Sequence, residues 1–146
     1  MIYELMGDAD TAQVAQLEAM CFSAPWSEKA IIGELSNPLS LWIVAREDDE
    51  VVGYVGSQSV MGEADMMNLA VRPDWRRKGI GAQLVSCLIE KLKSNDVYSL
   101  TLEVRASNEP AKRLYKVMGF QQVGRRPNYY TAPKEDALIL RKEWDI

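Results

Sequence analysis

The 146-residue sequence is 47% hydrophobic and 26% charged, a balance typical of a globular domain with its own core, so we expect a single domain over residues 1–146. Its formal net charge of −4 argues against direct nucleic-acid binding through a broad basic face. The chain has two distant cysteines and no histidine, which excludes Ser-His-Asp and Cys-His nucleophiles and predicts neither a disulfide framework nor a metal site.

The N-terminal part of the chain predicts a short strand and two helices. It lacks the pattern of a secretory signal, and no apolar run reaches the ~18 residues of a membrane span, so we expect a cytoplasmic protein. Residues 2–6 suit a strand. Residues 8–22 carry apolar side chains at helical spacing, with Asp8 or Asp10 as the cap, and residues 28–35 predict a second helix.

The middle of the chain changes to the composition of β-strands. Residues 40–46 and 51–60 are rich in β-branched and aromatic side chains and are joined by the turn-forming E-D-D-E, which predicts a hairpin. A third strand over residues 64–72 ends at Pro73, because proline has no N–H to give to a ladder.

A strand, a helix and another strand follow one another in the next segment. After R-R-K-G-I-G, residues 76–81, a wide apolar stripe predicts a helix packed on a sheet. This stripe comprises Ile80, Leu84, Val85, Leu88, Ile89 and Leu92. Residues 99–105 alternate apolar and polar side chains, which is typical of a strand. Such a crossover places the two flanking strands parallel in one sheet.

The C-terminal part predicts one more helix and two more strands. Ser107 or Asn108 can cap the helix, and Gly119 can end it in the left-handed conformation. Apolar runs at residues 120–125 and 136–142 close the sheet around the loop R-R-P-N-Y-Y-T-A-P-K. The fold class is therefore mixed α/β.

The basic turn before the long helix predicts an anion site. Arg76, Arg77 and Lys78 stand at the end of the helix dipole that is already positive. Gly79 and Gly81 allow a bulky anion to approach the free N–H groups of the first turn, and a phosphate or pyrophosphate suits this arrangement. The spacing fits neither a P-loop nor a dinucleotide fingerprint. A solvated basic turn before a helix packed on the core is the alternative.

This turn resembles the [QR]-x-x-G-x-[GA] signature of the GNAT N-acetyltransferase superfamily, and the preceding N-L-A-V-R-P resembles its splayed strand. The resemblance implies a mostly antiparallel twisted sheet with one splayed parallel strand pair, flanked by about four helices. It also implies acetyl-CoA as co-substrate and no metal. The pantetheine arm would pair with the main chain of Leu69, Ala70 and Val71. The pyrophosphate would bind at Arg76, Arg77, Lys78, Gly79, Gly81 and Ala82.

Further segments resemble the bacterial ribosomal-protein-alanine N-acetyltransferases, and together they cover nearly the whole chain. These segments are P-W-S-E-K, L-E-V-R-A-S-N-E-P-A-K-R-L-Y-K-V-M-G-F, R-P-N-Y-Y and E-D-A-L-I-L. The resemblance implies that an acetyl group moves to the α-amino group of an N-terminal alanine in a small-subunit ribosomal protein.

Two side chains match the catalytic positions of that family. An α-amino group has a pKa of about 7.7 to 8.0 and must lose a proton before it attacks a thioester. Glu103 is expected to be the general base, although a carboxylate paired with Arg105 or Arg113 is the alternative. The resemblance makes Tyr115 the general acid, although a core aromatic is the alternative. Asn108 can cap its helix and contact the cofactor, because its amide offers both a donor and an acceptor, and we expect a CoA contact.

The sequence determines the residues that would bind the peptide acceptor less clearly. Trp26, Tyr129 and Tyr130 either wall a peptide channel or seal the edge of the core. Glu135 and Asp136 either help to hold a cationic N-terminus or an arginine near it, or form a solvated acidic turn.

The same cofactor site would also serve other functions. A GNAT enzyme that acetylates a small-molecule amine or a protein lysine is the main alternative. An acyl-CoA-binding sensor without turnover and a ribosome-associated structural protein are further alternatives. Glu103 together with Tyr115 favours an enzyme over a sensor.

Overall fold

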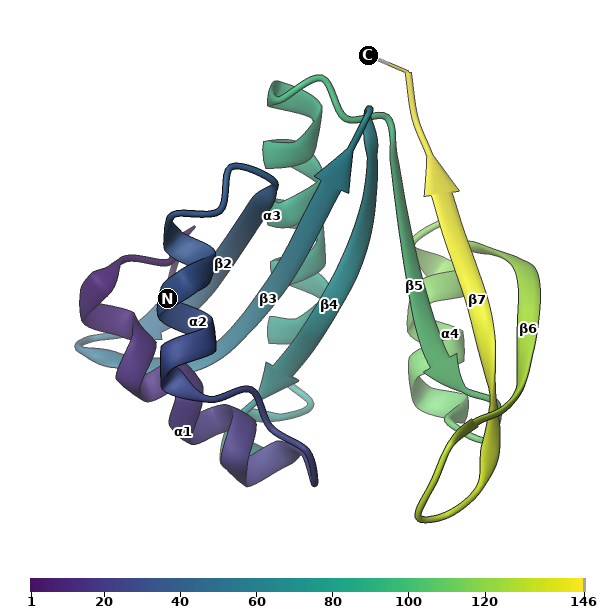
Figure 1. Cartoon of the computed structure of the whole chain (residues 1–146), viewed down its shortest axis with the longest axis horizontal. Helices are drawn as coiled ribbons and strands as arrows, with labels where there is room; N and C mark the ends of the chain where they lie inside the picture. Colours follow the sequence, from purple (N-terminus) through teal and green to yellow (C-terminus); the bar gives the residue numbers. More distant parts are fainter. Residues whose placement is uncertain (146) are drawn as a thin grey trace.

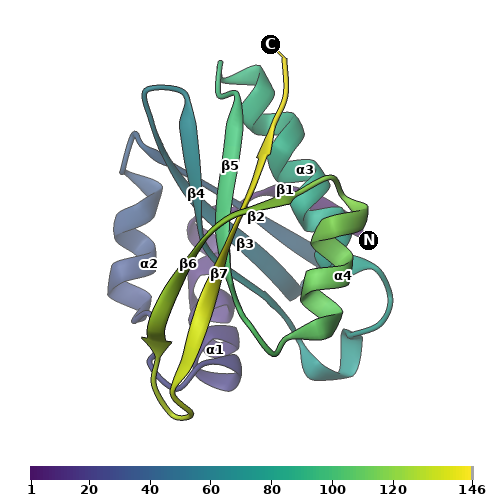
Figure 2. The ribbon, with the colours of Figure 1, turned by 90° about the vertical axis from the view of Figure 1, so that its right-hand side faces the viewer.

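The computed structural model describes residues 1–145, which form a mixed sheet of seven strands with two α-helices on each face (Figures 1 and 2). The strands are β1 (Ile2–Leu5), β2 (Ser40–Glu47), β3 (Glu50–Val60), β4 (Glu63–Val71), β5 (Ser99–Arg105), β6 (Gln121–Tyr130) and β7 (Glu135–Glu143). The helices are α1 (Thr11–Cys21), α2 (Glu28–Leu35), α3 (Ile80–Ser94) and α4 (Glu109–Val117), with single 3-10 turns η1 (Asp8–Asp10) and η2 (Pro73–Trp75). Within these residues, no helix is both long and apolar enough to cross a membrane.

The sheet has the strand order β1-β2-β3-β4-β5-β7-β6. Neighbouring strands are antiparallel except β4 and β5, which are parallel because α3 carries the chain back from the end of one to the start of the other. Over the described chain, the parallel ladder covers residues 63–65 of β4 and 99–101 of β5 and goes no further. Beyond it the two strands separate towards their C-terminal ends (Figure 1). This confirms the predicted mixed fold with one splayed parallel pair.

Two hydrophobic cores lie on the two faces of the sheet, because alternate residues of a strand point to opposite sides. In β2, Ile43 and Ala45 join the core beneath α3, whereas Trp42 and Val44 join the core beneath α1 and α2. The predicted apolar stripe of α3 is confirmed, since all its members are at most 6% exposed. Full burial of a leucine contributes about 1.5–3 kcal/mol relative to an exposed one, so this stripe holds α3 on the sheet.

The C-terminal hairpin differs from the prediction. The segment R-R-P-N-Y-Y was expected in a loop, but β6 runs through it to Tyr130, and only residues 131–134 form the turn between β6 and β7 in the described chain. An edge strand tolerates Pro127, because its outer side needs no N–H donor. The register with β7 shifts in this stretch, and Asn128 adopts a φ of 54° while its N–H donates to Asp136 Oδ1 at 2.8 Å. A bulge therefore replaces the expected loop.

The predicted helix caps are confirmed in α4, whereas the predicted cap of α1 is not formed by a side chain among the described residues. Asn108 caps α4, since its Oδ1 accepts from the Ala111 N–H at 3.2 Å, and Gly119 follows the helix with a φ of 93°. Asp10 stands at the N-cap position of α1, but no side-chain cap is formed there within residues 1–145. Its carboxylate instead pairs with Arg46. The Asp10 side chain therefore binds Arg46 of β2 and does not cap α1.

Candidate active site

The turn between β4 and α3 presents main-chain N–H groups to solvent. Gly79 is the N-cap of α3 and has a φ of 77°, a conformation that costs a residue with a Cβ about 1–2 kcal/mol. Arg77 also has a positive φ, of 64°. In the part of the chain that the structure describes, no side chain caps this helix start. The first-turn donors are therefore available to an anion.

The three cations of the turn are exposed, and two of them have protein contacts. Arg76 donates from Nε to the Val71 carbonyl at 3.1 Å, and its Nη2 lies 3.6 Å from Cys21 Sγ at the end of α1. Lys78 Nζ lies 5.2 Å from the centre of the Trp75 ring. The positive charge thus surrounds the positive end of the α3 dipole, where an anion is stabilised by about 0.3–1 kcal/mol per interaction.

The last residues of β4 lead into this turn. Leu69 and Val71 are half-buried and Ala70 is 6% exposed, so their side chains contribute to the cores. A bulge precedes them, because the pairing with β3 passes from residue 66 to Asn68 and leaves Met67 out. The ladder with β5 ends before this segment, so its main chain on that side can pair with an extended ligand.

Glu103 lies on β5, two residues beyond the end of the parallel ladder. Its side chain is 29% exposed, and its Oε1 lies 3.5 Å from Arg126 Nε on β6. Its Oε2 is buried without a hydrogen-bond partner among residues 1–145. The pairing with Arg105 or Arg113, considered as an alternative, is therefore wrong, and Arg126 takes that place. Sequence reasoning could not find this partner, because Arg126 was expected in a loop. In the sheet Arg126 pairs with Ala137 and Glu103 with Ile139, which places both side chains on the same face.

The charge of Glu103 affects two neighbouring tyrosines. It raises the pKa of Tyr129, whereas burial is the first cause of the raised pKa of Tyr130 and Glu103 the second. The two rings pack edge to face with centroids 5.1 Å apart, and the Arg105 guanidinium lies 4.3 Å from the Tyr130 ring centre. Both tyrosines therefore belong to the surroundings of Glu103.

Tyr115 lies on the other face of β5. Leu102 and Val104 of β5 share with Tyr115 the core beneath α3 and α4. Alternation along the strand therefore directs Glu103 to the opposite face, beneath α1 and α2. The Tyr115 ring packs edge to face on Phe120, with centroids 5.4 Å apart. It is 5% exposed, and burial raises its pKa to about 12. The two predicted catalytic side chains thus lie on opposite faces of β5.

The acidic pair at the start of β7 holds arginines and main-chain donors. Glu135 accepts from the Ser107 N–H at 2.7 Å and lies 3.3 Å from Arg105. Its pKa is lowered, first by the hydrogen bonding at Ser107. The pKa of Asp136 is also lowered, first by the Asn128 N–H and then by Arg125. Both carboxylates are therefore engaged by arginines and main-chain N–H groups of the protein itself.

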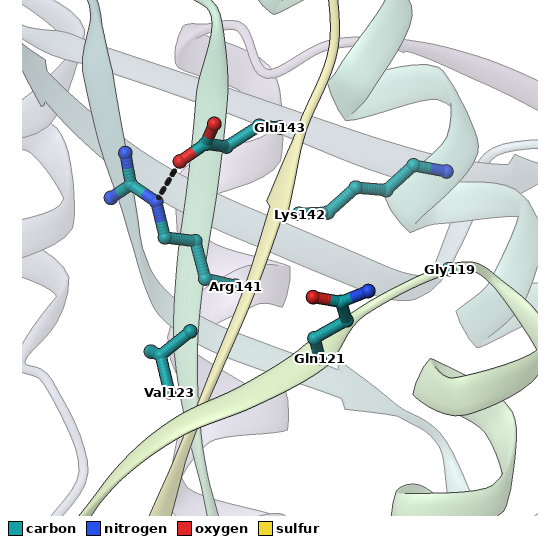
Figure 3. A pocket seen from close by; sticks show the side chains of 6 residues that line it. All are labelled: Gly119, Gln121, Val123, Arg141, Lys142 and Glu143. Carbon is teal, nitrogen blue, oxygen red and sulfur yellow. Dashed lines mark hydrogen bonds and ion pairs between the residues drawn. The ribbon is translucent and has the colours of Figure 1, made fainter.

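A separate pocket of about 340 Å³ lies at the other end of the C-terminal strands (Figure 3). Its lining residues are Gly119, Gln121, Val123, Arg141, Lys142 and Glu143, and Arg141 Nε donates to Glu143 at 2.9 Å. Glu143 pairs with Ser99, at the closed end of the β4–β5 ladder. This pocket is therefore remote from the ends of the strands that carry the predicted site.

Sequence reasoning assigned no role to Arg126 or to Glu18 of α1, a completely buried carboxylate. The local signal for Glu18 is its spacing, four residues after Val14 and three before Cys21, which places it on the apolar face of α1.

Comparison with known proteins gives this arrangement a family. Residues 11–120 match the model of the Acetyltransferase (GNAT) family. A [ribosomal protein bS18]-alanine N-acetyltransferase of Salmonella typhimurium is 37% identical over 139 residues, which span 93% of each chain. The crystal structure of the ribosomal-protein-S18-alanine N-acetyltransferase from Escherichia coli superposes with a TM-score of 0.90 at 32% identity, over 99% of this chain and 94% of that one.

The fold recurs in a more distant protein that was solved with coenzyme A. An aminoglycoside 6'-N-acetyltransferase complexed with coenzyme A has a TM-score of 0.84 at 19% identity, over 98% of this chain and 97% of that one. The splayed strands and the basic turn agree with the family match. The chain is an acyltransferase and belongs to the GNAT acetyltransferase family.

Proposed function

We propose that this enzyme transfers the acetyl group of acetyl-CoA to the α-amino group of an N-terminal alanine of a small-subunit ribosomal protein. The observation that carries the proposal is the parting of β4 from β5 beside the uncapped start of α3. An extended ligand with an anionic end fits that combination. The names of the relatives, which act on alanine of ribosomal protein bS18, support the choice of acceptor.

The donor would be held by main-chain groups and cations. The N–H groups at Gly79, Gly81 and Ala82 would bind the pyrophosphate, and Arg76, Arg77 and Lys78 would add charge. These residues occupy the exposed or half-exposed turn at the positive end of α3.

The rest of the donor would lie along β4. The main chain of Leu69, Ala70 and Val71 would bond the pantetheine amides, which would fill the ladder that β5 leaves open. Asn108 uses its Oδ1 to cap α4, so its Nδ2 can still donate to the cofactor.

Glu103 would act as the general base. Its buried Oε2 can accept a proton from the incoming ammonium group, which then attacks the thioester carbonyl carbon as a neutral amine. Collapse of the tetrahedral intermediate breaks the carbon–sulfur bond and releases CoA, and the nitrogen loses its second proton to solvent to give the neutral amide. Glu103 lies at the C-terminal end of β5, the end at which the two strands are apart.

Tyr115 would act as the acid. Burial raises its pKa to about 12, so its hydroxyl stays protonated at neutral pH and can donate to the departing sulfur. Its position on the α4 face of β5 would put the donor of the proton and the base on opposite sides of the reacting group.

A peptide assay tests the proposal. Purified enzyme and acetyl-CoA would be offered an Ala-initiated peptide with an internal lysine, the same peptide with a blocked N-terminus, and a small primary amine. We expect one acetyl group on the free N-terminus, located by tandem mass spectrometry, and none on the blocked peptide. Acetylation of lysine or of the small amine alone would replace the proposed acceptor by one of the alternatives.

A further inference from the structure

A buried carboxylate joins three elements on the α1 side of the sheet. Glu18 is 0% exposed. Its Oε1 accepts from the Trp26 N–H at 2.8 Å, and its Oε2 accepts from the Tyr54 hydroxyl and from Asn68 Nδ2, the latter at 2.8 Å. A buried ionisable group carries a desolvation cost, so its hydrogen bonds must offset that cost. The acetyl-transfer steps described above make no use of it.

The three partners of Glu18 lie in different parts of the fold. Trp26 belongs to the connection between α1 and α2, and Tyr54 lies on β3. Asn68 lies on β4, next to the bulge at Met67 and directly before the segment that would hold pantetheine. One helical turn after Glu18, Cys21 contacts Arg76 of the basic turn. The last turn of α1 therefore touches both ends of the candidate donor site.

The connection between α1 and α2 lies on the same face of the sheet as Glu103, where an acceptor would meet the proposed base. In Figure 1 it runs near the end of the sheet at which β4 and β5 are apart, and the β6–β7 turn lies at the same end beyond β5. The Trp26 ring packs edge to face on Trp42, with centroids 5.4 Å apart, and Trp42 stacks on Tyr54. Glu18 thus holds the main chain of Trp26 and Trp42 holds its ring, both against the sheet.

We propose that Glu18 is a positioning residue for acetyl transfer, which fixes the acceptor-side connection at Trp26 against Asn68 on the donor strand. This inference rests on the proposed function. The carboxylate can do this because it accepts from both partners at once, and a shift of about 1 Å between reacting groups can cost about 100-fold in rate.

Glu34 offers a matched control. It is also a buried glutamate, 8% exposed, and it accepts hydrogen bonds from three side chains. Its donors are Asn37, Trp42 and Gln58, so its contacts join α2 to β2 and β3. Removal of Glu34 should therefore destabilise the same face of the sheet, but it leaves the Glu18 bonds to Trp26 and Asn68 in place.

The test compares Glu18→Leu, Glu18→Gln and Glu34→Leu in steady-state assays with the Ala-initiated peptide. We expect Glu18→Leu to raise the KM for the peptide about tenfold, while the KM for acetyl-CoA changes less than about threefold. Glu18→Gln should restore most of the activity, because its oxygen can accept from Trp26 and its amide can bond Asn68 once that amide is rotated. Glu34→Leu should lower the melting temperature similarly and leave the peptide KM near the wild-type value.

The outcomes separate the two proposals. A wild-type enzyme that fails to acetylate the peptide overturns the proposed function and this inference with it. An active wild type whose peptide KM responds equally to Glu18→Leu and Glu34→Leu overturns the inference alone. If Glu18→Leu does not fold, Asn68→Ala removes only the link to β4. It should still raise the peptide KM and speed hydrogen exchange at residues 22–27, and unchanged values of both would contradict the inference.

Discussion

The two carboxylate oxygens of Glu103 lie in different environments. One is 3.5 Å from the Arg126 guanidinium, and the other is buried without a hydrogen-bond partner in the described residues. An unsatisfied buried acceptor typically costs about 1–3 kcal/mol, so folding alone does not favour this arrangement. Such a cost is expected at a site where a substrate proton supplies the missing bond.

Removal of this base should slow the chemical step. For Glu103→Gln we expect kcat to fall at least about 100-fold, with acetyl-CoA binding changed less than about twofold, since general bases typically contribute about 10²–10⁴. Stopped assays give kcat, and calorimetry gives the affinity. Glu143→Gln is the control, because Glu143 lies at the closed end of the ladder. A Glu103→Gln enzyme with the full rate across the pH range would exclude Glu103 as the base.

Tyr115 offers a substitution that separates packing from chemistry. Tyr115→Phe keeps the ring that packs on Phe120, so the melting temperature should stay close to that of the wild type. We expect kcat to fall because the departing CoA sulfur loses its donor. Tyr98→Phe, at a tyrosine that is 36% exposed, is the matched control. Unchanged kinetics in Tyr115→Phe would show that this tyrosine serves only the core.

At the scale of elements, α3 combines a buried stripe with an exposed anion-binding end. Its apolar residues hold it on β2, β3 and β4, and its N-terminus follows a turn with three cations. Packing therefore compensates for the charge that the dipole disfavours. The N-terminus of α3 can serve as an anion site because the buried stripe, and not the N-terminal turn, holds the helix on the sheet.

Charge reversal in this turn should weaken donor binding. For Arg77→Glu we expect the Kd for acetyl-CoA to rise roughly tenfold at low salt and less at high salt, because exposed charges are screened over about 10 Å at 0.1 M. Lys91→Glu makes the same charge change in the last turn of α3 and should leave the Kd unaltered. Equal effects of the two charge reversals would indicate that the net charge of the protein, and not a local pyrophosphate site, sets the affinity for acetyl-CoA.

At the scale of the whole molecule, stability depends on buried carboxylates whose pKa values move in opposite directions. Burial by itself raises the pKa of Asp10, but hydrogen bonds from Arg46 and Gly7 and the charge of Arg46 outweigh it and lower the pKa. Burial raises the pKa of Glu18, and the bonds from Trp26 and Asn68 offset this in part. Ionised Asp10 therefore stabilises the fold, whereas ionised Glu18 costs stability.

Acid titration of stability tests this balance. Asp10 contributes stability above its unfolded pKa of 3.8, and this contribution is lost as the pH falls through the lowered folded value. The contribution of Glu18 has the opposite sign, since it is present below the unfolded value of 4.5 and is lost as the pH rises through the raised one. Urea unfolding of Asp10→Asn should show a weaker loss of stability below pH 3.8 than the wild type. A parallel pH dependence in both proteins would contradict the assignment.

The sequence by itself determined the order of the elements, the parallel crossover through α3, the caps at Asn108 and Gly119, and the positive turn before α3. Each of these follows from residues close together in the chain, where periodicity, φ preference and charge act locally. Only the tertiary structure decided where Arg126, Asn68 and Tyr54 find their partners, and how β6 continues through Pro127. The Glu18 contacts join residues 36 and 50 positions apart, and no local preference encodes such pairs. They form because the folded sheet brings buried polar groups within reach of one another, and each must then find a partner.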